Sequence, residues 1–235
     1  INGHADWEVL TGRRLQNEKR TGLSELFRPG LRKALAVGVG LSVFGQFTGV
    51  NIVIYYGPII LEGAGFAINS AVRFQVLIGI INLLFTVVAL MKIDSWGRRP
   101  LLIGGMIAVC LSLTGIGSLF LAGKAGGIWT VVLLCIYIGS LAVSINAVIW
   151  VLTGEIYPTH IRGRAMSVAT FANWSTNFAA AFLFPWYVSK TGMGAGFFTF
   201  AAFCLAGTVF FWKLVPETKG KSLEDIERMW IKNNP

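Results

Sequence analysis

Charged side chains are scarce in this chain. They make up 13% of its 235 residues, whereas apolar residues make up 54%. Soluble domains average about 25% charged residues, so the composition predicts an all-α integral membrane protein with the lipid bilayer as its surroundings. Cysteine and histidine are also rare. The three cysteines (Cys110, Cys135 and Cys204) all lie in apolar segments, which argues against a disulfide framework.

The sequence also lacks the usual marks of catalysis. The two histidines are too few for a metal site, and no nucleophile–base pair or phosphate-binding loop is evident. We therefore expect neither an enzyme nor a cofactor.

Long apolar runs dominate instead. Six segments have the length and hydropathy of membrane spans: 34–61, 72–91, 101–121, 129–156, 165–188 and 196–215. We expect a cytoplasmic linker with an intracellular helix (1–33), a six-helix bundle (34–215) and a cytoplasmic tail helix (216–235). Residues 222–225 resemble a capping box that would begin the tail helix.

The basic residues are distributed unevenly. Seventeen of the 20 lysines and arginines lie in segments 1–33, 92–100, 157–164 and 213–235. With six spans these segments share one side of the membrane, and the positive-inside rule places that side in the cytoplasm. We therefore expect a plasma (inner) membrane protein with both termini cytoplasmic. The same bias explains the net charge of +9 without a nucleic-acid partner.

Polar side chains interrupt the first span at Gln46, Thr48, Asn51, Tyr55 and Tyr56. Side-chain amides are costly in hydrocarbon unless a partner satisfies them. They favour either an internal surface that binds a polar, uncharged ligand or hydrogen bonding between helices. Thr48, Asn51 and Tyr55 have the spacing of one helix face, and nearby glycines and a proline let this helix bend.

Further polar and indole side chains recur at membrane depth in three other spans: Asn82, Asn146, Trp150, Asn173, Trp174 and Asn177. Amides can donate to and accept from hydroxyls, and an indole face can stack on the apolar face of a pyranose. This combination suits a sugar. No carboxylate lies deep in these spans, which argues against a cationic substrate.

Charged residues gather at the cytoplasmic span ends. Asp94, Arg98 and Arg99 follow the second span, Glu155 ends the fourth, and Arg162 lies just beyond it. They are consistent with salt bridges between helices that form in one state and break in another, or with simple anchoring of the span ends.

Five strings, in this order, resemble the sugar porter family of the major facilitator superfamily, specifically its C-terminal six-helix half. They are Gln46-Phe47-Thr48-Gly49-Val50-Asn51 with Tyr55-Tyr56; Asp94-x-x-Gly97-Arg98-Arg99; Trp150 with Glu155-Ile156-Tyr157-Pro158 and Arg162-Gly163; Asn173-Trp174-x-x-Asn177; and Pro216-Glu217-Thr218-Lys219-Gly220.

The resemblance implies roles for these residues. Residues that would contact the sugar are Gln46, Asn51, Tyr55, Asn82, Asn146, Trp150, Asn173, Trp174 and Asn177. Residues that would serve the gates and the cytoplasmic charge network are Tyr56, Asp94, Arg98, Arg99, Glu155, Arg162 and Glu217. The partner would be an N-terminal six-helix half, on the same or a separate chain.

Two positions depart from the family pattern. The family has two glutamines in a row where this chain has Gly45-Gln46, so one hydroxyl contact is missing. The fourth span reads Asn146-Ala147-Val148-Ile149-Trp150 in place of a Gly-Pro-rich stretch, which removes helix-breaking residues.

We therefore expect transport of a hexose or pentose by alternating access. A non-transporting sugar sensor and a porter for a polyol or cyclitol such as inositol remain the alternatives.

Overall fold

The computed structural model describes residues 26–27, 31–159, 161–222, 225–226 and 229–230. Most of the linker and intracellular helix expected for 1–33 lies outside the described residues. So do parts of the tail helix.

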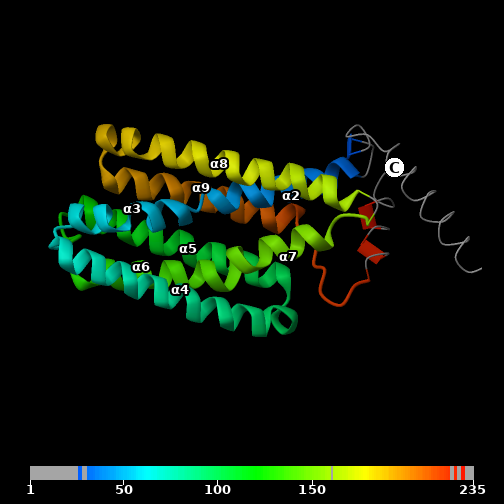
Figure 1. Ribbon diagram of the computed structural model, residues 1–235, viewed down its shortest axis with the longest axis horizontal. Coiled ribbons are helices and arrows are strands. Elements are labelled where there is room, and N and C mark those ends of the chain that lie inside the picture. Colours follow the sequence, from blue (N-terminus) through cyan, green and yellow to red (C-terminus); the bar gives the residue numbers. More distant parts are fainter. Residues whose placement is uncertain (1–25, 28–30, 160, 223–224, 227–228, 231–235) are drawn as a thin grey trace, which may run out of the picture.

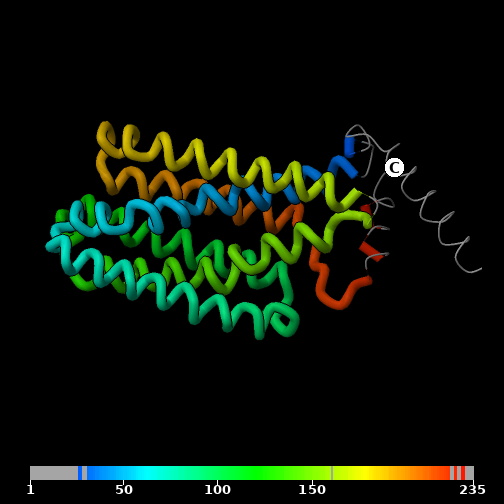
Figure 2. The backbone as a smooth tube through the Cα atoms, in the orientation of Figure 1, coloured from blue at the N-terminus to red at the C-terminus, as the bar shows by residue number. Residues whose placement is uncertain are grey.

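The described chain is helical throughout its apolar segments, because a segment in hydrocarbon must satisfy its backbone N–H and C=O groups internally. In order, the elements are α2 (Leu31–Gln46), α3 (Val50–Gly63), α4 (Ile68–Trp96), α5 (Arg98–Leu121), α6 (Ile128–Leu141), the π-helical turn η2 (Ala142–Asn146), α7 (Ala147–Glu155), α8 (Arg162–Thr191) and α9 (Met193–Leu214). They run beside one another in one bundle whose connections alternate between its two ends (Figure 1). The start of α2, in blue, and the tail, in red, lie at the same end (Figure 2).

Within the described residues, five stretches are long and apolar enough to cross a membrane: Leu31–Gly63, Ile68–Trp96, Arg98–Leu121, Ile128–Glu155 and Met193–Leu214. They match five of the six expected spans. The remaining expected span, 165–188, lies in α8, which has 30 residues and includes the polar Asn173 and Asn177. Since α8 packs against α2 and α3 and runs the length of the bundle, it remains the expected sixth crossing (Figure 1).

The first span is broken at the position where the sequence allows bending. α2 ends at Gln46, and α3 begins after Gly49, whose φ of 81° is left-handed. Only glycine adopts this conformation without a steric cost. The break leaves Thr48 outside α3, which carries Asn51 and Tyr55. The prediction that these three residues share one helix face is therefore wrong for Thr48. Thr48 is fully buried, while Tyr55 is 53% exposed.

The fourth span is also irregular. The segment before Trp150 lacks the helix-breaking residues of the family pattern, yet it does not form a regular α-helix. Instead η2 inserts a π turn that ends at Asn146. Such turns interrupt the regular hydrogen-bond ladder and are common at functional sites. The interruption therefore does not depend on helix-breaking residues.

Glycines allow the backbones of α5 and α9 to approach each other closely. A side-chain carbon added at Gly117 of α5 would lie 3.2 Å from the carbonyl oxygen of Gly194 in α9, and the reverse distance is the same. Close backbone approach of this kind is typical of membrane helices, where dispersion contacts drive association.

The tail packs under the bundle. The capping box is present: the Asp225 N–H donates to Ser222 Oγ (3.2 Å), and the Ser222 N–H donates to Asp225 Oδ2 (3.4 Å). Further on, Trp230 is buried and its Nε1 donates to the carbonyl oxygen of Ile156 at 3.0 Å. This bond attaches the tail to the connection that follows α7.

Candidate functional site

Three side-chain amides meet where the first span is broken. Asn51 Nδ2 donates to Gln46 Oε1 at 2.9 Å, and Gln46 Nε2 donates to Asn173 Oδ1 at 3.0 Å. The chain of bonds joins α2, α3 and α8. Gln46, which the wheel of an unbroken helix turns away from Asn51, reaches it because the turn at 47–49 reorients α3. We call these three residues the amide relay.

Thr48 holds the break in place. Its hydroxyl donates to the Gly45 carbonyl at 2.6 Å, and its own carbonyl accepts from the buried Tyr137 hydroxyl at 2.9 Å. The Gly45 carbonyl also accepts from the Thr48 N–H at 3.4 Å, so Thr48 bonds the end of α2 through both its backbone and its side chain. Thr48 is therefore structural, and Tyr137 is a supporting residue that sequence reasoning missed, because a lone tyrosine in an apolar span carries no signal.

The departure at Gly45 has a steric explanation. A side-chain carbon at Gly45 would lie 2.3 Å from Ile149 Cδ1. Ile149 belongs to the second departure from the family pattern, and its side chain occupies the space beside Gly45. Of the second departure, Ile149 alone is thus matched to Gly45 across α2 and α7.

None of the remaining expected contact residues bonds to the relay among the described hydrogen bonds. Asn177 is buried one turn along α8 from Asn173, while Trp150 and Trp174 are 47% and 56% exposed. Asn82 and Asn146 are half-buried, and among the described hydrogen bonds neither side chain reaches the relay. Tyr55 is half exposed on α3.

Tyr56 connects α3 to α8 at the other end of the span. Its hydroxyl donates to the Ala181 carbonyl at 3.2 Å, and its ring lies 5.7 Å from that of Phe184. It therefore closes α3 onto α8 on the far side of the relay from Arg98 and Glu155.

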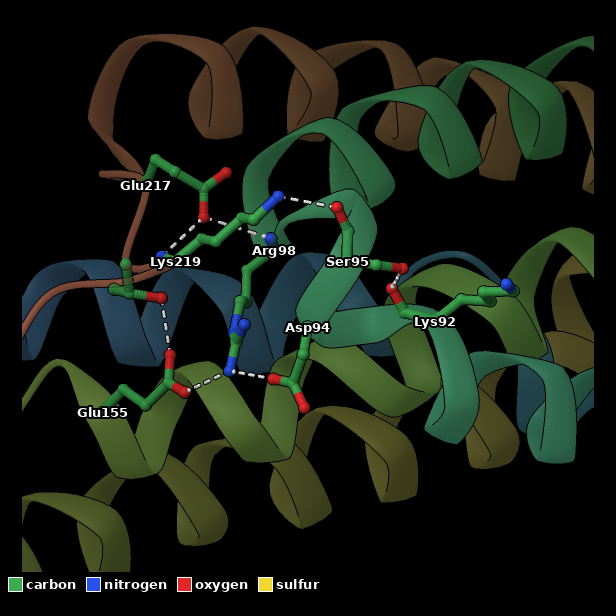
Figure 3. Close-up of polar contacts among 8 residues, drawn as sticks. Lys92, Asp94, Ser95, Arg98, Glu155, Glu217 and Lys219 are labelled. Atoms are coloured by element: carbon green, nitrogen blue, oxygen red, sulfur yellow. Dashed lines mark hydrogen bonds and ion pairs between the residues drawn. The ribbon is translucent and has the colours of Figure 1, made fainter.

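The charges expected at the cytoplasmic span ends form a network centred on Arg98 (Figure 3). The Arg98 guanidinium lies 2.9 Å from Glu155 Oε1 and 2.7 Å from Asp94 Oδ1. The Arg98 side chain is 12% exposed and Glu155 is 25% exposed, whereas Asp94 is 80% exposed. The bond to Glu155 joins the start of α5 to the end of α7 and is the less screened of the two.

Glu217 was expected in the charge network, but its hydrogen bonds within the described chain are to backbone N–H groups. Its carboxylate accepts from the backbone N–H groups of Arg98 and Arg99, each at 3.1 Å, and of Lys219 at 3.0 Å. It thereby caps the N-terminus of α5, where unpaired N–H groups and the helix dipole favour negative charge. Gly97 just before this helix has a φ of 87°. A side chain there would be strained and would meet Glu217 Oε2 at 3.0 Å.

Thr218 was not expected to take part. Its side chain is buried, and its hydroxyl donates to Glu155 Oε2, so Glu155 connects the end of α7 to the tail as well as to Arg98 of α5. Lys219 adds a second link through its Nζ, which donates to the Ser95 carbonyl at 2.6 Å (Figure 3). The closing motif of the sequence marks this segment, but not which helix end it contacts.

The other two arginines do not pair with a carboxylate among the described residues. The Arg162 guanidinium donates to the Tyr157 carbonyl at 3.3 Å, and Arg99 donates to the carbonyl of Trp212. Both satisfy backbone groups at helix ends instead. The Tyr157 ring packs against Gly38, and burial raises the pKa of its hydroxyl.

Comparisons with known proteins agree with this architecture. The sequence matches the family described as Sugar (and other) transporter over residues 5–230. It is 36% identical over 218 residues to the arabinose-proton symporter of Bacillus subtilis, covering 93% of this chain and 47% of the relative. It is 36% identical over 202 residues to the D-xylose-proton symporter of Escherichia coli, covering 83% and 41%.

A solved structure is also similar. It is the proton:xylose symporter XylE of the major facilitator superfamily bound to 6-bromo-6-deoxy-D-glucose. Its TM-score is 0.79 at 35% identity, over 92% of this chain and 46% of that one. The chain spans about half the length of the curated relatives it matches.

Proposed function

Because the chain belongs to the sugar transporter family of the major facilitator superfamily, we propose that it forms the C-terminal six-helix half of a transporter that carries a pentose or hexose across a membrane. An N-terminal half, on the same or a separate chain, completes the site. The relatives named for arabinose and xylose transport support a pentose as the first substrate to test.

The amide relay is the observation that carries this proposal. Asn51, Gln46 and Asn173 bind one another in series across three elements. Amide groups arranged in series orient one another, and each amide offers two donors and two acceptor lone pairs. A sugar hydroxyl that enters the relay can both accept and donate, so it replaces or extends these bonds at little cost.

Aromatic faces supply the apolar part of the site. Trp150 on α7 and Trp174 on α8 are about half exposed, which leaves indole surface for the C–H face of a pyranose. Tyr55 lies at the border, and Asn82, Asn146 and Asn177 provide further amides. The apolar side chain of Ile149 lies beside Gly45, where it leaves less room for the sugar.

Transport follows from alternating access about this site. The two helix breaks, at Gly49 and at η2, let parts of the first and fourth spans move without dismantling the whole bundle. The Arg98–Glu155 pair holds the cytoplasmic ends of α5 and α7 together while the cytoplasmic side is closed. Sugar binding shifts the population between outward-open and inward-open states, and opening inward separates this pair.

The membrane arrangement completes the proposal. The charge network and the tail face the cytoplasm, and the protein lies in the plasma (inner) membrane. The uneven distribution of lysine and arginine supports this orientation.

The test is uptake of labelled xylose, arabinose, glucose and inositol by transport-deficient cells that express the complete protein containing this chain. We expect saturable uptake of one sugar. Asn51→Ala and Trp150→Ala should raise the apparent KM roughly three- to tenfold, as expected from losing one uncharged contact in each case. An uncoupler added during uptake distinguishes proton symport from facilitated diffusion.

Matched controls separate site effects from general damage. Asn69→Ala removes an exposed asparagine at the start of α4, and Trp129→Ala removes an exposed tryptophan at the start of α6. Neither should change KM. Unchanged KM in the Asn51 and Trp150 variants would refute the site, and sugar binding without uptake would favour a sensor.

A further inference from the structure

A polar pocket lies at the cytoplasmic end of α9, and none of the relay residues lines it. It has a volume of about 300 Å³, and the residues lining it include Arg99, Lys213, Pro216, Met229 and Trp230. Two of these are cations, and none is an anion. The pocket is therefore a positively charged recess between α5, α9 and the tail.

The Arg99 guanidinium has a donor without a hydrogen-bond partner in the part of the chain that the structure describes. One of its Nη atoms donates to the Trp212 carbonyl, but its Nε is buried and has no hydrogen-bond partner among the described residues. A buried, unpaired N–H of a charged group costs free energy unless a ligand or water satisfies it. A guanidinium presents paired donors to an oxyanion, which is why phosphate commonly fills such a position.

Within the described residues, no carboxylate forms an ion pair with the cations of the recess. Glu217 lies on the backbone N–H groups of Arg98 and Arg99, and none of the described salt bridges joins it to the Arg99 or Lys213 side chain. Asp94 and Glu155 both pair with Arg98. Arg99 and Lys213 therefore retain their charge for another partner.

The position also fits a membrane interface. Lys213 lies in the last turn of α9, and its neighbours Trp212 and Leu214 are exposed apolar residues. The hydrocarbon core ends where the apolar helix ends, and lipid headgroups begin there. An exposed tryptophan beside a lysine is typical of that depth.

We propose that Arg99 and Lys213 form a binding site for a phosphate-bearing anion, supplied by the headgroup of an anionic lipid of the cytoplasmic leaflet or by a soluble phosphate. The exposed Trp212 and Leu214 favour the lipid, since they would lie against its acyl chain. The site is independent of the sugar site and does not require the protein to transport anything.

The test uses the purified complete protein and its Arg99→Gln, Lys213→Gln and Lys92→Gln variants. Lys92 is an exposed lysine at the same end of the bundle on α4, outside the pocket, and serves as the matched control. Native mass spectrometry counts retained phosphatidylglycerol against phosphatidylcholine. In a second arm, inorganic phosphate is titrated into the protein in phosphatidylcholine nanodiscs while thermal stability is followed.

We expect retention of phosphatidylglycerol to fall roughly fivefold in the Arg99 and Lys213 variants and to stay unchanged in the Lys92 variant. If only the stabilisation by inorganic phosphate is lost, the ligand is a soluble anion. If the wild type and the three variants retain phosphatidylglycerol equally and are stabilised equally by inorganic phosphate, the proposed site is refuted. If Arg99→Gln fails to fold, the exposed Lys213→Gln decides the outcome alone.

Discussion

Gly45 and Ile149 form a matched pair in which the missing side chain of one residue makes room for the other. A side-chain carbon added at Gly45 would lie 2.3 Å from Ile149 Cδ1. A distance this short forces either the isoleucine or the helix backbone to move. Because Cδ1 is the free end of the isoleucine side chain, Ile149 is the residue that would move, and glycine at position 45 leaves its side chain in place.

Gly45→Ala should destabilise the protein by about 1–3 kcal/mol, the usual cost of overpacking. Adding Ile149→Val, which removes the clashing Cδ1 atom, should restore most of that stability. Thermal denaturation of the detergent-solubilised protein measures both. Gly79→Ala is the control, since nothing lies within 4 Å of its added carbon. The pairing is refuted if Gly45→Ala melts at the same temperature as Gly79→Ala.

Glu217 shows how one distant carboxylate can begin a helix. It accepts from two N–H groups at the start of α5, although Arg98 lies 119 residues earlier in the sequence. α5 has no acidic residue in its first turn and no side-chain cap of its own at Gly97. The tail therefore supplies the cap, and this contact helps to keep the tail at the base of the bundle.

At the scale of elements, two interrupted helices lie at the centre of the proposed mechanism. Gly49 breaks the first span next to the amide relay, and η2 interrupts the fourth span just before Trp150. Each break places polar or aromatic side chains where a regular helix would bury only apolar ones. The segments beyond the breaks, α3 and α7, are short, with 14 and 9 residues. Short segments can tilt with little loss of packing.

The Arg98–Glu155 pair connects two of these elements, so its loss should alter the balance between states. Glu155→Gln keeps an oxygen for Thr218 but removes the charge that faces Arg98. We expect turnover to fall roughly fivefold or more while apparent sugar affinity changes little, in line with usual coupling energies of about 1–3 kcal/mol. Initial uptake rates over a range of sugar concentrations separate the two effects.

Asp94→Asn is the matched control for that prediction. Asp94 also pairs with Arg98, but its side chain is 80% exposed, and exposed pairs contribute only about 0.2–1 kcal/mol. Its effect should be the smaller of the two. Equal turnover in the wild type and the Glu155 variant would leave these charges with an anchoring role alone.

At the scale of the whole molecule, the bundle has two chemically distinct ends. The tail packs beside the start of α5, the start of α8 and the end of α9 (Figure 1), and the tail and these segments carry Arg98, Arg99, Arg162, Lys213 and Lys219. At the other end, the basic residues of the described segments are Arg73, Lys124 and Lys190 alone. An exposed apolar surface lies between them, large on α4, where few residues are buried.

This asymmetry predicts which end can be reached from outside the cell. In intact cells, Lys190→Cys should react with a membrane-impermeant maleimide, and Lys221→Cys should react only after permeabilisation. The parent protein controls for Cys110, Cys135 and Cys204, which are buried or half-buried. Labelling of Lys221→Cys in intact cells would place the charge network outside.

Much of this arrangement was determined by the sequence itself. Membrane insertion, the helical class and the segregation of positive charge depend on the composition of each segment, because hydrocarbon imposes the same demand on any chain that enters it. The involvement of Asp94, Arg98 and Glu155 could also be predicted, since these charges follow the spans directly. The match to the sugar transporter family rests on the same linear information.

Tertiary structure alone decided which residues meet. Gln46 pairs with Asn173 across 127 positions, Ile149 fills the space beside Gly45, and Glu217 caps α5 instead of joining the ion pairs. Each contact depends on the rotation and depth of two helices at once. Periodicity within one segment carries no information about its neighbour. The π turn at η2 belongs here too, because none of its residues is a helix breaker and packing against α4 and α5 accompanies the extra residue.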